Sequence, residues 1–262
     1  MAEQGDGMVR DGWRGLAPKN LALRFSGAPL DTVKLAAAAF MLTDHVNTVL
    51  LKSTVPLMWR FGRIAFPLFC VVLACHLARG SEPKRYAALL LLLAIPTQPI
   101  FGAAFQGELG NVLFTLAAGA ALAGALLRAD PRLQHAFIAI GAAVVFAWPL
   151  RARSGVDFGL GGILLPAAIT LTLASSRAHA LWAAILLIGL NTGGWRPPEE
   201  SYWAAAARDA GFAAIGGAAV VGLAALAQGR PRFLPRYALH VFYPGHLLAL
   251  ALLRLAGAGA GS

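Results

Sequence analysis

The sequence DTVKLAAAAFMLTDHVNTVLL, residues 31–51, is mostly apolar and is about as long as a helix that crosses a membrane, which needs roughly 20 residues. Comparable apolar stretches follow one another as far as residue 256. Over all 262 residues, 58% are hydrophobic and 13% are charged, whereas soluble domains carry roughly 25% charged residues. The chain is therefore predicted to fold as an all-α, polytopic bundle of membrane-spanning helices.

Nine apolar stretches predict about nine transmembrane helices, joined by short segments rich in Pro, Gly and Arg. Together they form one predicted membrane domain, residues 31–256, between an N-terminal arm, residues 1–30, and a flexible tail, residues 257–262. The predicted spans are residues 31–51, 62–78, 86–103, 111–127, 134–150, 157–174, 178–194, 205–228 and 237–256.

The basic residues predict the orientation of these helices and the class of partner. With the N-terminus in the cytoplasm, fourteen of the 22 Lys and Arg residues lie on the cytoplasmic side, as the positive-inside rule requires. The arm has no short apolar run that ends in a small-residue cleavage site, so it is predicted to be a retained cytoplasmic segment. The net charge is +10, but the basic residues lie singly or in small groups between apolar runs, which favours membrane lipids over nucleic acid as partners.

Asp44 and His45 are two titratable side chains in the middle of the first predicted helix. They lie roughly 15–20 Å along the axis from its cytoplasmic end, which is at or beyond mid-bilayer. An ionisable group at this depth costs several kcal/mol unless it faces a wet cavity or a partner on another helix. Both residues are therefore candidate catalytic residues. A buried pair that ties helices together is the alternative.

The helical period predicts a cationic neighbour for Asp44 and another for His45. Neighbours in a helix point about 100° apart, so Asp44 is poorly placed to orient His45 and is predicted to pair with Arg63 of the next helix. Lys34 lies eleven residues before His45 and shares its face to within about 20°. A cation and a deep base on one stripe suit a long ligand with phosphates at one end, such as coenzyme A. Lys34 and Arg63 are thus candidate cofactor-binding residues, with simple snorkelling of Lys34 to the interface as the alternative.

Four more residues are candidates for lining the same site. Arg60 opens the tract RFGRIAFPLF at the start of the second predicted helix, Asn111 lies at the polar entry of the fourth, and Tyr243 and His246 lie near mid-depth in the last. For His246, the alternative is a buried histidine satisfied by a backbone carbonyl. No metal-ligand spacing, Walker loop or dinucleotide fingerprint occurs in the sequence, so no metal is predicted.

Four tracts, in this order, resemble the TraX family of conjugal-transfer membrane proteins, including the plasmid relatives called TrbP: KLAAAAFMLTDH (34–45), FGRIAFPLF (61–69), GNVLFTLAAG (110–119) and VFYPGHL (241–247). TraX proteins are implicated in acetylating the amino terminus of conjugative pilin. The family also resembles membrane acyltransferases whose first helix carries a basic residue, ten intervening residues and a histidine. Lys34 and His45 have that spacing, with Lys in place of the commoner Arg.

The resemblance implies roles for the candidate residues. His45 is expected to be the catalytic base or a transient acyl acceptor, with Asp44 in support, while Arg63, Tyr243 and His246 help to build the site. The expected function is transfer of an acetyl group from acetyl-CoA to the N-terminal amine of a pilin subunit, at the bacterial inner membrane. The alternatives are O-acetylation of a cell-envelope glycan or lipid, and a transporter or pilus-assembly scaffold without enzymatic activity.

Overall fold

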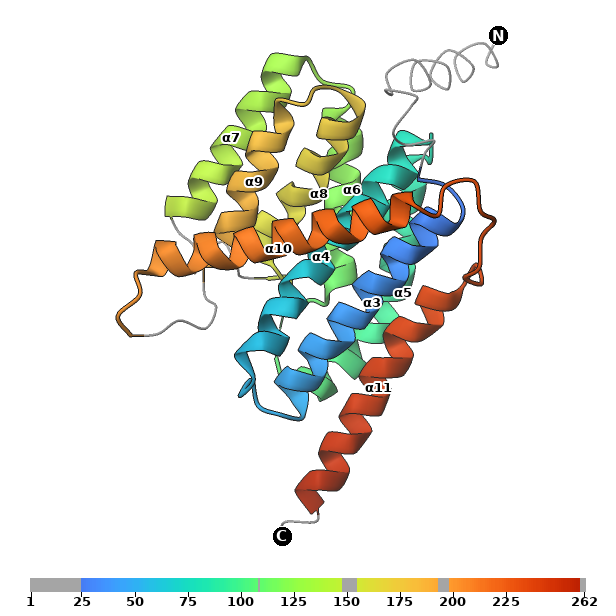
Figure 1. Ribbon diagram of the computed structural model, residues 1–262, viewed down its shortest axis with the longest axis vertical. Helices are drawn as coiled ribbons and strands as arrows, with labels where there is room; N and C mark the ends of the chain where they lie inside the picture. The colour runs from blue at the N-terminus through green and yellow to red at the C-terminus, as the bar shows by residue number, and fades with distance from the viewer. Residues whose placement is uncertain (1–24, 108, 148–154, 193–197, 260–262) are drawn as a thin grey trace.

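The structure, a computed structural model, describes residues 25–107, 109–147, 155–192 and 198–259, and these fold into a bundle of α-helices (Figure 1). Within them the one β contact is an isolated bridge between Gly110 and Val156. The predicted arm lies outside the described residues up to position 24, as does the end of the tail, residues 260–262. The helices are α3 (Ala28–Val49), α4 (Pro56–Ala78), α5 (Pro83–Phe105), α6 (Val112–Leu126), α7 (Pro131–Ala147), α8 (Gly159–Ala174), α9 (His179–Leu190), α10 (Tyr202–Ala225) and α11 (Ala238–Gly259).

Local sequence signals account for several helix starts. α4, α5 and α7 each begin at a proline, whose fixed φ suits the first turn and whose missing N–H would have had no helical partner. The side chain of Glu82 caps α5 by accepting from the backbone N–H of Lys84 and Arg85. Asn111 caps α6 in the same way, and Ser201 caps α10. Each helix overlaps one predicted span.

The number of membrane spans is smaller than the predicted nine. Among the described residues, four helices are long and apolar enough to cross a membrane, and they are α4, α5, α10 and α11. α6 to α9 have 15, 17, 16 and 12 residues, or about 18–26 Å at 1.5 Å per residue, against a hydrocarbon core of about 30 Å. α3 is long enough, but Asp31, Lys34 and Asp44 lower its hydropathy. Counting apolar stretches overestimated the spans because interior helices of a bundle are equally apolar.

Small residues let the interior helices approach closely. A Cβ added to Gly119 of α6 would lie 2.8 Å from the ring of Pro166 in α8, and one added to Gly162 of α8 would lie 2.7 Å from Thr115 of α6. Such small-residue contacts are the usual means of packing helices in membranes, where burial of apolar surface gives little net gain. α6 and α8 thus form the centre of the bundle.

The longer helices surround this centre. α3 and α4 form an antiparallel hairpin, α10 runs crosswise over both, and α11 lies beside α3 and α5 (Figure 1). Large apolar side chains on the outer faces of α5, α10 and α11 are exposed, as lipid-facing residues would be: Leu92, Ile95, Ile215, Leu223, Val241, Leu252 and Leu255. The prediction of a helical membrane bundle is therefore confirmed, with fewer spans.

Candidate active site

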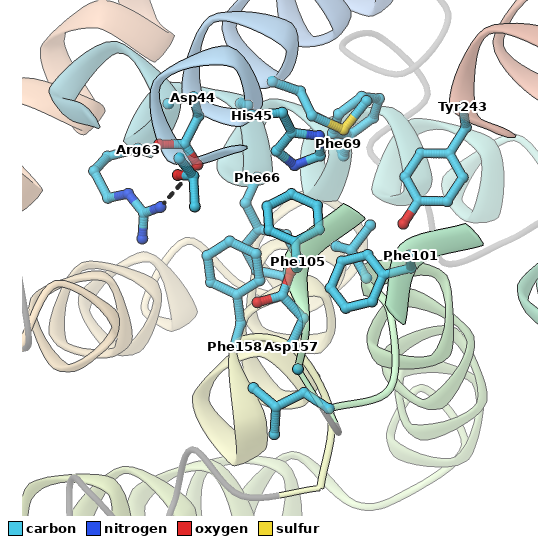
Figure 2. A pocket seen from close by; sticks show the side chains of 17 residues that line it. Asp44, His45, Arg63, Phe66, Phe69, Phe101, Phe105, Asp157, Phe158 and Tyr243 are labelled. Carbon is cyan, nitrogen blue, oxygen red and sulfur yellow. Dashed lines mark hydrogen bonds and ion pairs between the residues drawn. The ribbon is translucent and has the colours of Figure 1, made fainter. Parts of the chain in front are cut away.

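A cavity of about 330 Å³ lies between α3, α4, α5, α6, α11 and the loop before α8 (Figure 2). Its wall is mostly aromatic, with Phe66, Phe69, Phe101, Phe105 and Phe158. A few polar side chains converge on it, and they are Asp44, His45, Thr48, Arg63, Asp157 and Tyr243. Apolar walls with a few convergent polar groups, at this volume, are typical of small-molecule sites. We call it the first cavity.

Asp44 and Arg63 form an ion pair in the wall of the first cavity. The guanidinium Nη2 lies 3.2 Å from Asp44 Oδ2, so the structure contains the pairing expected from the helical period. The guanidinium also lies over the ring of Trp59, 4.8 Å from its centroid. Asp44 Oδ1 and Arg63 Nε are buried without a hydrogen-bond partner among the described residues. The pair thus still has one acceptor and one donor unused beside the cavity.

Gly62 allows α4 to approach α3 at this pair. A Cβ added to Gly62 would stand 2.4 Å from both Cβ and Cγ of Asp44, which is closer than real Cβ contacts come. Rotation of the Asp44 side chain would not relieve the overlap, because the backbone of α3 fixes the position of its Cβ. The position therefore requires glycine if Asp44 is to keep its place beside Arg63.

Replacing Gly62 with alanine is expected to separate α3 from α4 and to break the Asp44–Arg63 pair. We expect the free energy of unfolding to fall by about 1–3 kcal/mol, the usual cost of overpacking. Thermal or denaturant unfolding in detergent measures the change. Gly211→Ala in α10 is the matched control, because nothing lies within 4 Å of its added Cβ. Equal stability of the two variants would contradict the packing argument.

His45 and His246 come together although 201 positions separate them in the chain. His45 Nδ1 lies 2.8 Å from His246 Nε2, and the two rings are nearly parallel. His246 Nδ1 lies 2.9 Å from the backbone oxygen of Phe242, so the backbone contact considered for this histidine is present as well. His45 lines the first cavity, and His246, which is 8% exposed, lies behind it.

These contacts assign the protons of the two rings when both are neutral. A carbonyl oxygen only accepts, so His246 Nδ1 carries a proton and donates it to Phe242, which leaves His246 Nε2 as an acceptor. His45 Nδ1 must then be the donor to His246, and the lone pair of His45 lies on Nε2. His45 Nε2 makes no hydrogen bond within the described residues. The pair therefore holds His45 as a base in the cavity wall.

Asp157 is a cavity residue that the sequence analysis did not single out. It lies in the loop before α8, where the Thr115 hydroxyl donates to its backbone oxygen and its N–H donates to Gly110 O at 2.7 Å. In the sequence it is a lone carboxylate at the start of an apolar stretch, which is the usual place for a helix-end charge. Only the packing of this loop against α6 brings it to the first cavity.

A second, smaller cavity of about 120 Å³ adjoins the first, and Met41, Phe69, Val112 and Tyr243 line both. The second cavity extends away from His45 toward Tyr86, Leu239 and His240, and its lining is mostly apolar. Together the two cavities extend from the N-terminal end of α11, at Leu239 and His240, to the site around His45, and we call this path the route.

Lys34 lies toward the far end of this route and not in either wall. Its Nζ lies 3.5 Å from Asp31, and Arg232 Nε lies 3.6 Å from the same carboxylate. Asp31 also accepts from the backbone N–H of Phe233 and Leu234, so it fastens the segment before α11 to the start of α3. Arg79 lies within electrostatic range of Lys34, and Lys34 and Arg236 lie within range of His240. Basic residues therefore surround the end of the second cavity at His240.

Two predicted site residues lie elsewhere. Arg60 lies in the first turns of α4, and its Nε pairs at 3.3 Å with the buried carboxylate of Asp209 in α10. Asn111 is fully buried and ties α6 to α5, with its amide 2.9 Å from both Ala94 O and Gln98 Oε1. Neither lines the first or the second cavity.

Comparison with known families gives the chain an identity. The sequence model of one family, described as TraX protein, matches residues 29–254, which contain α4 to α10, most of α3 and α11, and both cavities. The chain belongs to the TraX family. The resemblance drawn from four short tracts is thereby confirmed for nearly the whole TraX chain. No curated protein and no solved structure matches it significantly.

Within this TraX chain, the four tracts that carry the resemblance meet at one place. The first supplies Asp44 and His45, the second supplies Gly62 and Arg63, and the fourth supplies Tyr243 and His246. All of these line the first cavity except His246, which supports His45 from behind. The third tract supplies Val112, at the boundary of the two cavities.

Proposed function

We propose that the protein is a membrane-embedded acyltransferase of the bacterial inner membrane that transfers an acetyl group from acetyl-CoA to the N-terminal amine of a pilin subunit. The observation that carries the proposal is the His45 ring in the cavity wall, with its Nδ1 proton given to His246 and its Nε2 lone pair unused. A neutral imidazole held in this way is suited to general-base catalysis. The family supplies the pilin, because TraX proteins are associated with pilin acetylation.

His45 would accept one proton from the attacking amine and pass it to the leaving thiolate. The neutral amine attacks the thioester carbon, its proton passes to His45 Nε2, and the C–S bond breaks to release the thiolate, which takes that proton. A free α-amine has a pKa near 7.7–8.0, so part of it is already unprotonated near neutral pH and able to attack. General-base help of this kind contributes roughly 10²–10⁴ in rate.

The layout of charge supports a coenzyme A donor. Lys34, Arg232 and Arg79 gather near the end of the second cavity at His240, where the phosphates of the donor would meet them. The second cavity then leads toward His45. This arrangement requires the donor to enter from the side of the α3 N-terminus, which the positive-inside rule places in the cytoplasm.

An amine is a better acceptor than a hydroxyl for this site. Asp157 lies in the wall of the first cavity, and Asp44, although paired with Arg63 through Oδ2, keeps its Oδ1 without a partner there. Carboxylates attract an ammonium group, which must lose a proton to a base such as His45 before it attacks. A hydroxyl acceptor on a glycan or lipid gives the two carboxylates no such role.

The test is acyl transfer by purified protein in detergent. Radiolabelled acetyl-CoA is supplied with a synthetic pilin N-terminal peptide, and in parallel with the same peptide blocked at its α-amine. We expect label in the free peptide and none in the blocked one. Label in neither peptide together with no binding of acetyl-CoA would overturn the proposal in favour of a scaffold or transporter. Binding without transfer would keep the donor and exclude this acceptor.

A further inference from the structure

Tyr243 lies at the junction of the two cavities. It is one of the residues that line both, and it comes from α11, three residues before His246. Its ring contacts that of His246 edge-on, with centroids 5.7 Å apart. In Figure 2 its hydroxyl is turned toward the first cavity, on the opposite side from the Asp44–Arg63 pair. A ligand that extends from the second cavity to His45 would therefore cross the part of the wall that Tyr243 shares with Met41, Phe69 and Val112.

The O–H of Tyr243 is a hydrogen-bond donor that has no acceptor among the described residues. The side chain is 6% exposed, and its oxygen is buried without a hydrogen bond of normal geometry among the described residues. The backbone N–H of Val112 lies close to this oxygen but can only donate to it, so the O–H proton is left without an acceptor. Leaving a buried polar group unpaired costs about 1–3 kcal/mol, so such groups are rare in native structures and call for an explanation. Phenylalanine would fill the same space without this cost. A ligand that accepts a hydrogen bond at the junction supplies the explanation.

We propose, on the basis of the acyl transfer above, that the arm of the thioester donor lies in the second cavity and that the thioester carbonyl oxygen accepts a hydrogen bond from the O–H of Tyr243. The second cavity is mostly apolar and smaller than the first, so it suits the arm of coenzyme A and leaves its nucleotide outside, at the basic residues near His240. The reacting carbon then lies at the junction, between the donor arm and His45.

The hydroxyl acts where negative charge develops. When the amine nitrogen bonds to the thioester carbon, the π electrons move to the carbonyl oxygen, and the Tyr243 O–H stabilises that oxyanion. The amine proton goes to His45 Nε2. The carbonyl re-forms as the C–S bond breaks, and the thiolate leaves with the proton from His45, which yields an amide and free coenzyme A. Tyr243 keeps its proton throughout and is an electrostatic catalyst, distinct from the base.

The decisive variant is Tyr243→Phe, which removes only the hydroxyl. We expect kcat to fall by about 10²–10³, the usual loss for one oxyanion donor, with the KM for acetyl-CoA raised by no more than about fivefold. A structural hydroxyl would behave differently, because its removal would lower the unfolding temperature. Here that temperature should change little, since the O–H has no acceptor within the described residues. Tyr237→Phe is the matched control, because Tyr237 is exposed and lines neither cavity.

A binding measurement tests the same contact without turnover. The carba-dethia analogue of acetyl-CoA, in which CH₂ replaces sulfur, keeps the carbonyl, whereas ethyl-CoA is a thioether without one. The parent protein should prefer the ketone about fivefold, and Tyr243→Phe should lose that preference. Equal affinity of the parent for both analogues, or a kcat for Tyr243→Phe close to the parent's, would overturn the role of Tyr243. Loss of transfer on replacing His45 would still uphold the acyltransferase proposal in that case.

Discussion

Replacing His45 with alanine is expected to lower the rate of acetyl transfer by about 10²–10⁴, the contribution of a positioned general base. The contact with His246 leaves the Nε2 lone pair of His45 free, and among the described residues no other histidine lines the first cavity. Acetyl-CoA binding should persist, because the arm and the phosphates of the donor contact other parts of the protein. Single-turnover transfer to the pilin peptide, with donor affinity measured separately, checks both expectations.

His135→Ala is the control for this prediction. His135 packs against His179 and accepts a hydrogen bond from Trp182 Nε1. It lines neither cavity. This variant should transfer acetyl groups at the parent rate. A His45→Ala protein that accumulates normally and still acetylates the peptide at the parent rate would remove His45 from the mechanism.

The helices of this protein were predictable because their starts and their apolar content are local properties. Pro83 with Glu82, and Ser201 before Tyr202, define helix starts within a few residues of the chain. The number of membrane spans was not predictable from hydropathy. α8 is as apolar as a span, but its Leu164, Leu165 and Leu171 pack against other helices of the bundle. Hydropathy does not distinguish burial in protein from burial in lipid.

Part of the site followed from helical geometry alone. The 100° step between Asp44 and His45 directed Asp44 to a different helix, and Arg63 is its partner. The contact between His45 and His246 did not follow, because it depends on α11 packing beside α3. Asn111 shows the opposite case. A polar residue at a helix entry was a plausible cavity residue, but its amide is used to cap α6 and to bind α5.

Asp44→Leu and Arg63→Met are each expected to lower the free energy of unfolding by about 3 kcal/mol, because each leaves one charge of the pair unpaired. This value is at the lower end of the range for buried pairs, since the pair borders a cavity. The double variant, with apolar side chains at both positions, should recover most of the loss because neither charge remains. Denaturant unfolding of the parent, both single variants and the double variant measures the coupling between the two residues.

Activity in the same four proteins separates structure from chemistry at this pair. If Asp44 and Arg63 only hold α3 against α4, the double variant regains acetyl transfer together with stability. We expect it to regain stability alone, because the carboxylate also lines the cavity beside His45 and helps to receive the cationic acceptor. A stable double variant with the parent rate of transfer would show that the pair is a packing device, and that recognition of the acceptor rests on other residues of the first cavity, Asp157 foremost.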